Sequence, residues 1–286
     1  MLVLGRISPV ATIANARGMA TLKEISMRLK SIQNIGKITK SMKMIASTKV
    51  GRAQRTMDAA RVYGAAGVGL LKHTQTDDLE MKSPLLITCS SDRGLCGGIH
   101  SSLSKATKRS LIELPESTSA ILGVKARAKL QYDFASRIKI SFDGVCKYNP
   151  SWLEAATIAD EILGQKVPSD GSYIIYNRFK SVIAFEPVTI KLPTAELIAE
   201  APSLAAYEIE DDVIGNYQEF MVANTLYWAL AEGYASEVTA RRSAMENATK
   251  NADEMVKKLT LMFNRSRQAV ITNDLCDIIT GASALE

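Results

Sequence analysis

The sequence predicts a mixed α/β protein in which long helices from the two ends of the chain pair as an antiparallel coiled coil, with a smaller α/β domain between them in sequence. Three observations lead to this prediction. Apolar residues near the N-terminus recur every three or four positions. A second helical pattern, free of proline, occupies the C-terminal part of the chain. Between them, short apolar segments alternate with helical ones.

The composition permits a buried core and excludes several kinds of site. The 286 residues are 47% hydrophobic and 23% charged, which is ample for a core. No apolar run approaches the ~20 residues of a membrane span, so any membrane contact is expected to be indirect. The two histidines are isolated, and we expect neither a metal nor a cofactor. The four cysteines form no Cys-x-x-Cys pair and indicate a reducing compartment.

Residues 1–19 differ in composition from the rest of the chain. They include Arg6 and Arg17, hydroxyl residues and many small apolar residues, but no acid. This composition is typical of a mitochondrial transit peptide, whereas a secretory signal has a longer unbroken apolar core. We therefore expect the mature chain to start near Ala20, with a disordered tail as the alternative.

Segment 20–80 is predicted to be the N-terminal coiled-coil helix. Thr21 and Glu24 have the spacing of a capping box, and the helix is expected to continue through Ala60 and to weaken at the glycines that follow. Its apolar stripe is too narrow for a broad globular face and is typical of a coiled-coil seam. The stripe consists of Leu22, Ile25, Leu29, Ile32, Ile35, Ile38, Met42 and Ile45.

The same helix has a basic surface. No acid occurs between Ile25 and Met57, whereas the stretch contains Arg28, Lys30, Lys37, Lys40, Lys43, Lys49, Arg52 and Arg55. Such a run is either a solvated helix face or a surface for a partner of opposite charge. Nucleic acid is not the expected partner, because the stretch lacks aromatic residues that could stack on bases and no known binding motif occurs.

Segment 81–209 is predicted to be a Rossmann-like α/β domain. Strands alternate with helices along it, which favours a mostly parallel sheet covered on its faces. The expected strands are 85–89, 120–124, 138–142, 173–177 and 187–192, and the expected helices are 99–114, 125–134 and 151–163.

The loop between Ser90 and His100 is the most enzyme-like part of the chain. Its three glycines precede a helix and could bind phosphate, but their spacing matches neither the dinucleotide-binding pattern nor the P-loop. Cys96 and His100 suggest a nucleophile with a base, yet no orienting group accompanies them. We interpret Cys96 as a packed loop cysteine and keep a nucleotide-dependent α/β enzyme with helical extensions as the alternative function.

Segment 210–286 is predicted to be the C-terminal coiled-coil helix. At 1.5 Å per residue it would be about 110 Å long, which is more than a compact domain of this size can bury. Small residues in its middle would let a second helix approach closely. In an antiparallel pair its end reaches beyond the first helix, so the apolar residues there need a socket in another protein.

Five runs of residues carry a family resemblance. They are TLKEI at 21–25, KITKSMKM at 37–44, SDRGLCGG at 91–98, AMENATKNA at 244–252 and NRSRQAVIT at 264–272, and a Gly-Ala pair follows at 281–282. Together they closely resemble the gamma subunit of the F-type ATP synthase over essentially the whole chain after the transit segment, and the mitochondrial form fits best. Asp274 stands where the family usually has Glu, which keeps the charge.

The resemblance implies a non-catalytic rotor subunit. A coiled-coil scaffold without energy coupling is kept as a third alternative, beside the nucleotide-dependent enzyme. In that family the terminal helices form a shaft inside a ring of alpha and beta subunits, on the matrix side of the mitochondrial inner membrane. The α/β part meets the delta and epsilon subunits and the membrane c-ring. Proton flow turns the c-ring and the shaft, and the shaft forces the catalytic beta subunits through different nucleotide affinities.

The resemblance also implies which residues contact the alpha–beta ring. Arg267, Gln268 and Thr272 match positions that contact the beta subunits near the top of the shaft. Met42 and the loop that holds Cys96 match positions facing a lower, acidic part of beta. The other expected contacts are Lys40, Lys43 and Arg93 in these motifs, and Ile278 and Ile279 at the apolar tip.

Overall fold

The structure is a computed structural model that describes residues 21–74, 76, 81–201, 204, 207–208 and 213–284. The predicted transit segment, 1–19, lies outside these residues. The chain divides into two compact units, Lys37–Thr249 and Met1–Gly36 with Lys250–Glu286. Among the described helices, none is both long and apolar enough to cross a membrane.

One five-stranded sheet of order β3-β2-β1-β4-β5 lies in the larger unit. Its strands are β1 (Leu85–Cys89), β2 (Thr118–Leu122), β3 (Ile138–Phe142), β4 (Gly171–Phe179) and β5 (Phe185–Pro193). The first four run parallel and β5 is antiparallel to β4, because the short connection between β4 and β5 permits only a hairpin. The predicted mostly parallel sheet is confirmed.

The predicted second strand is placed two residues too late. The strand ends at Leu122, and Gly123 takes φ +93 as the chain turns into the next helix. This conformation is open mainly to glycine, so the strand cannot continue through Val124 as the apolar pattern suggested.

Three helices of the larger unit agree closely with the predicted ranges: α3 (Ile99–Glu113), α4 (Val124–Phe134) and α5 (Trp152–Gly164). The short helices α2 (Gly69–His73), η2 (Ala135–Arg137) and α6 (Ala195–Ala199) were not predicted, because three to five residues are too few to show a helical period.

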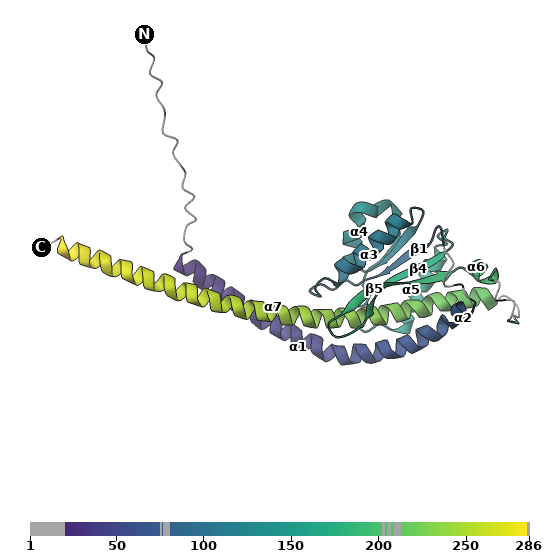
Figure 1. Ribbon diagram of the computed structural model, residues 1–286, viewed down its shortest axis with the longest axis horizontal. Coiled ribbons are helices and arrows are strands. Elements are labelled where there is room, and N and C mark those ends of the chain that lie inside the picture. The colour runs from purple at the N-terminus through teal and green to yellow at the C-terminus, as the bar shows by residue number, and fades with distance from the viewer. Residues whose placement is uncertain are drawn as a thin grey trace, which may run out of the picture. The chain divides into compact units, whose positions relative to one another are not determined.

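Both faces of the sheet are covered. Side chains of β1 alternate between two apolar clusters: Leu86 packs with residues of α3 and α4, whereas Leu85 and Ile87 pack with residues of α5 and of the two long helices. Figure 1 shows α3 and α4 on one side of the sheet and the long helices on the other. The helices that begin and end the chain are therefore part of the core of the α/β region.

The two long helices are α1 (Leu22–Gly67) and α7 (Val213–Ser283), of 46 and 71 residues. At the start of α1, Thr21 N donates to Glu24 Oε2 at 2.9 Å and Glu24 N donates to Thr21 Oγ1 at 3.4 Å. The predicted capping box is therefore confirmed.

Contacts between α1 and α7 run in opposite sequence directions. In the larger unit Thr249 Oγ1 donates to Thr39 Oγ1 at 2.9 Å, and Asn224 Nδ2 donates to the Tyr63 carbonyl at 3.1 Å. In the smaller unit a methyl group added at Gly36 would lie 3.5 Å from Ala252 Cβ. Residue numbers fall along α7 as they rise along α1, so the predicted antiparallel pairing is confirmed.

Candidate partner-binding surfaces

The glycine-rich loop after β1 is tied to the ends of neighbouring strands. The Asp92 carboxylate accepts hydrogen bonds from the backbone N–H groups of Val124 at 2.8 Å and Gly144 at 2.6 Å. Arg93 Nη2 donates to the Lys147 carbonyl at 2.5 Å. Helix N-termini attract anions such as phosphate, because of the helix dipole and the free N–H groups there. At the N-terminus of α4 this position is taken by the carboxylate of Asp92.

His100 contacts this loop through both of its ring nitrogens. Its Nε2 lies 3.0 Å from the Arg93 carbonyl, and its Nδ1 lies 3.0 Å from Ser90 Oγ. A carbonyl can only accept, so Nε2 carries the proton and Nδ1 accepts from the Ser90 hydroxyl. Burial lowers the pKa of His100, which favours this neutral form. Both ring nitrogens are occupied by the loop, and neither is directed at Cys96 as a catalytic base.

Cys96 is a packed loop cysteine, as predicted. Its side chain is buried, and Sγ lies 3.7 Å from the Arg93 carbonyl. Burial raises the pKa of the Cys96 thiol to about 11, and the charge of Glu237 adds to this effect. The thiolate is the nucleophilic form of cysteine, so Cys96 is a protonated thiol at neutral pH.

Cys96 is therefore expected to resist alkylation in the folded chain. A raised pKa means that the thiolate is scarce below about pH 11, so the rate should stay low at pH 7 and rise as the pH approaches that value. Cys276 is exposed and should react first. Mass mapping of iodoacetamide adducts against pH measures both rates, and equal labelling of the two cysteines at pH 7 would contradict this assignment.

A hollow of about 290 Å³ lies beside the loop in the larger unit. Its lining combines an apolar floor with cationic groups from α1, the loop and α7: Met42, Ile45, Ala46, Lys49, Arg93, Gly94, Val238 and Arg241. We call these residues the basic pocket. Such a surface suits a segment that carries an apolar side chain flanked by carboxylates.

The structure brings only some of the predicted lower contacts together. Met42 and Arg93 line the basic pocket, Lys40 is exposed, and Lys43 Nζ forms a partly exposed ion pair with Glu246 at 3.2 Å. Cys96 is 2% exposed, whereas its neighbour Leu95 is 62% exposed with φ +61. Backbone strain of this kind clusters at functional sites, and Leu95 is the side chain that the loop presents outward.

Sequence reasoning missed Leu95, Lys49 and Arg241 as site residues. The exposure of Leu95 follows from its left-handed backbone, which its residue type does not signal. Lys49 was included in the basic run without a specific role. Arg241 reaches the loop from α7, where its Nε donates to the Gly94 carbonyl at 3.3 Å, and no local pattern indicates that contact.

The upper predicted contacts lie on the exposed C-terminal stretch of α7. Arg267, Gln268 and Thr272 are exposed, and Thr272 Oγ1 donates within the helix to the Gln268 carbonyl at 2.9 Å. The large apolar side chains there are also 44–67% exposed: Val270, Ile271, Leu275, Ile278 and Ile279. We call these five residues the apolar tip, and its exposed area is of the kind that marks a protein-binding surface.

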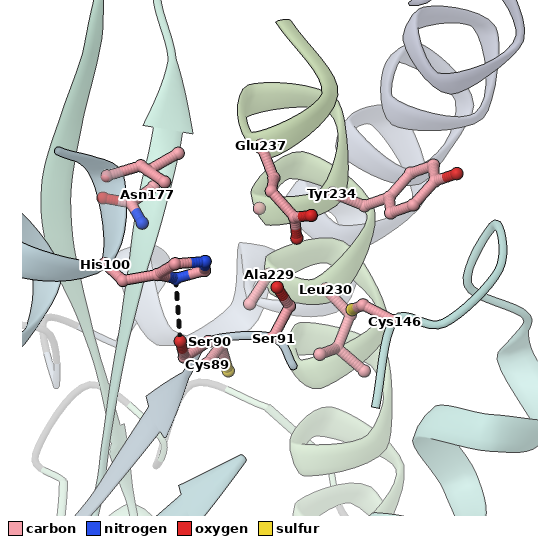
Figure 2. Close-up of a pocket in the computed structure, with 12 residues that line it drawn as sticks. Cys89, Ser90, Ser91, His100, Cys146, Asn177, Ala229, Leu230, Tyr234 and Glu237 are labelled. Atoms are coloured by element: carbon pink, nitrogen blue, oxygen red, sulfur yellow. Dashed lines mark hydrogen bonds between the residues drawn. The ribbon is translucent and has the colours of Figure 1, made fainter. Parts of the chain in front are cut away.

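The crevice where an open α/β sheet usually binds a ligand is filled. Strand order reverses at β1 and β4, and ligands of such folds lie at the carboxyl ends of the strands at this point. Figure 2 shows Ala229, Leu230 and Glu237 of α7 on the side of the helix that faces Ser90 and His100 at this end of the sheet. The remaining cavity is about 10 Å³, enough for about one water molecule and too small for a nucleotide.

No group of three or more His, Cys, Asp or Glu side chains that could hold a metal occurs among residues that the structure describes. Two ionisable side chains that line the filled crevice are engaged within the chain. Glu237 pairs with Arg241 one helical turn away on α7, and His100 is held by the loop.

Comparison with known proteins places the chain in a family. A family model described as ATP synthase matches residues 21–285. The chain is 46% identical to "ATP synthase subunit gamma, mitochondrial" of Yarrowia lipolytica over 280 residues, covering 96% of each chain. It is 43% identical to "ATP synthase F(1) complex subunit gamma, mitochondrial" of Rattus norvegicus over 273 residues, covering 93% of this chain and 100% of the rat one.

Solved structures agree with the fold. A chain from the central stalk and c-ring of the Tetrahymena thermophila mitochondrial ATP synthase matches with a TM-score of 0.64 and 27% identity, covering 74% of this chain and 99% of that one. A chain from the Euglena gracilis mitochondrial ATP synthase has a similar fold, with a TM-score of 0.77 and 22% identity over 94% of this chain and 95% of that one. The sequence therefore belongs to the ATP synthase gamma-subunit family.

Proposed function

We propose that this chain is the central rotor shaft of a mitochondrial ATP synthase, on the matrix side of the inner membrane. It couples proton-driven rotation of the membrane c-ring to conformational changes in the catalytic beta subunits. Its partners are the alpha and beta subunits of the catalytic ring, the delta and epsilon subunits and the c-ring. A relative of known structure comes from a preparation described as central stalk and c-ring, which supports this assignment.

The exposure of the apolar tip is the main support for this proposal. Ile278 and Ile279 are 67% and 66% exposed, and every described residue of α7 from Arg267 onward is exposed. Exposed apolar area of this extent favours an apolar socket in another protein. Dispersion and apolar contacts have no preferred direction, so the tip could turn in such a socket without a large barrier.

The residues around the basic pocket can form contacts that are weak and reversible. Arg93 and Met42 contribute positive charge and apolar surface to the basic pocket, and Lys40 is exposed on α1. Exposed ion pairs contribute only ~0–1 kcal/mol each and are screened by salt. A partner surface with carboxylates could therefore bind and release as the shaft turns. We propose that Lys40, Met42, Lys43, Arg93 and the loop around Cys96 form this lower contact, and that Arg267, Gln268 and Thr272 form the upper one.

We also propose that the chain has no catalytic site of its own. Three observations support this: α7 fills the crevice at the sheet switch point, Asp92 occupies the N-terminus of α4, and Cys96 is a buried thiol with a raised pKa. The alternative, a nucleotide-dependent enzyme, requires ATP to bind the chain tightly. Isothermal titration of the full chain with ATP distinguishes the two readings, because tight binding with turnover would favour the enzyme.

The proposed function is tested by co-purification. A tagged copy of the full chain, expressed with alpha and beta subunits, is expected to bring down three of each for every copy of itself. A coiled-coil scaffold without energy coupling would not give this stoichiometry. Recovery of the tagged chain without alpha and beta subunits would contradict the proposal.

A further inference from the structure

The carboxylate of Glu232 lies where three elements of the larger unit meet. Its side chain is fully buried, at 0% exposure. Oε1 accepts from Arg61 Nε of α1 at 3.2 Å and from the backbone N–H of Phe179, the last residue of β4, at 3.1 Å. Oε2 accepts from Trp228 Nε1 of α7 at 2.8 Å. Every partner is a donor, which suits a carboxylate with two accepting oxygens.

Phe179 is held by both long helices at once. Its N–H donates to Glu232 of α7, and its carbonyl accepts from Arg61 Nη2 of α1 at 2.8 Å. Arg61 and Glu232 also form an ion pair with each other through Arg61 Nη2. The three residues therefore form a closed set of contacts that joins α1, α7 and the end of β4, at the loop end of the β4–β5 hairpin.

This network is charged and has several hydrogen bonds, whereas Ser236 Oγ of α7 makes a single neutral one to the Asn177 carbonyl of β4 at 3.1 Å. Most of the other contacts between the sheet and the long helices are apolar, and hydrophobic attraction has no preferred direction. Hydrogen bonds are directional and weaken steeply when their angles change. A charged group with several such bonds therefore opposes rotation of the helix pair against the sheet.

Stability alone does not explain a buried charge at this position. Taking a carboxylate out of water is costly, and a well-packed apolar residue is often at least as stabilising as a buried ion pair. The best-attested use of such groups is to fix one register between packed elements. Trp228 lies between the two sets of elements: a methyl group added at Gly64 of α1 would lie 2.7 Å from Trp228 Cβ, and the Trp228 ring lies 6.2 Å from the ring of Tyr176 on β4, centroid to centroid.

We propose that Glu232, with Arg61 and Trp228, is a torsional lock that makes the α/β region and the two long helices turn as one body. This inference rests on the proposed rotor function and names Glu232 as a positioning residue for it. Without the lock, part of the torque that enters through the α/β region would be lost in twisting this region against the helix pair.

Glu232→Gln tests the lock with little change in shape. An amide has only one accepting atom, so in either orientation its NH₂ group must face a donor: Trp228 Nε1–H in one case, Arg61 and Phe179 N–H in the other. The matched control is Glu186→Gln, which makes the same chemical change on β5, where Glu186 pairs with Arg178 and Lys180 at the exposed surface.

The measurement uses the complex with the catalytic ring fixed to a surface and held without turnover. A probe is attached to α4 at the 93% exposed Tyr132 through Tyr132→Cys, in a Cys276→Ser background. The width of its angular fluctuations reports the torsional stiffness between the α/β region and the ring. We expect a clear widening in Glu232→Gln and a several-fold lower ratio of proton-driven ATP synthesis to ATP hydrolysis, with neither change in Glu186→Gln.

Equal widths and equal ratios in the wild-type chain and Glu232→Gln would overturn the lock. If Glu232→Gln does not assemble, Trp228→Phe is measured instead. This variant loses one hydrogen bond to Glu232 Oε2 and keeps an aromatic ring in place, so it should widen the angular fluctuations by a smaller amount. An unchanged width in Trp228→Phe would then overturn the lock. Failure of the unmodified chain to assemble or turn in the ring would instead count against the proposed rotor function itself.

Discussion

Replacing Ile278 and Ile279 together with aspartate is expected to lower coupled ATP synthesis by about tenfold or more, through poorer assembly, poorer coupling or both. If the apolar tip sits in an apolar socket, each new carboxylate must leave water without a partner there. That step costs at least about 2 kcal/mol, which is more than tenfold in an association constant. Proton-driven ATP synthesis per assembled complex and the yield of complex measure the effect.

The fold of the chain should be unaffected by this double substitution. Both isoleucines are about two-thirds exposed, so the helix loses no buried contact within the described chain. Ile112→Asp is the matched control, because Ile112 of α3 is 68% exposed and belongs to neither proposed contact surface. Normal coupled synthesis in the double variant would refute the socket, and equal loss in the Ile112 control would show that the effect is not specific to the tip.

Gly123→Ala is expected to lower the free energy of unfolding by about 3 kcal/mol or more. Gly123 has φ +93, and an added Cβ would lie 2.7–2.8 Å from the backbone N, C and Cα of Ser91. Backbone atoms cannot move away as a flexible side chain can, so the strain falls on the loop that holds Arg93 and Cys96. Urea unfolding of the full chain measures the loss, and faster alkylation of Cys96 should accompany it.

Gly98→Ala provides the comparison for that experiment. Gly98 has φ −90, and nothing lies within 4 Å of a Cβ added there. Its substitution should change the free energy of unfolding by no more than about 1 kcal/mol. Similar losses for Gly98→Ala and Gly123→Ala would contradict the steric explanation.

Much of the fold could be predicted from the sequence because its strongest signals are periodic. The period from Leu22 to Ile45 and the proline-free C-terminal segment predicted both long helices, and continuous apolar runs predicted the strands. The predicted seam is wrong in part, because Ile35, Ile38 and Ile45 are 49%, 58% and 55% exposed while Thr39 and Ala46 are buried. The pattern did not give the end of β2 or the short helices. Gly123 ends β2 two residues before the apolar run ends, and helices of five residues such as α6 show no period.

The candidate surfaces were predictable to a lesser extent. The apolar tip followed from the unequal lengths of two antiparallel helices, which is a property of the whole pattern. The loop that holds Cys96 was found by its motif, but the side chain it exposes is Leu95, because the left-handed turn at that residue directs Cys96 inward. The set of Arg61, Phe179 and Glu232 joins residues 53 to 171 positions apart, and no local pattern in the sequence indicates it.

The central claim is that this chain turns inside a ring of alpha and beta subunits while the ring hydrolyses or makes ATP. Direct observation of a probe on the chain, in single complexes with the ring fixed to a surface and supplied with ATP, tests it most directly. We predict unidirectional rotation of the probe that depends on ATP and stops without it. A probe that stays fixed relative to the ring while ATP is hydrolysed at the normal rate would contradict the claim.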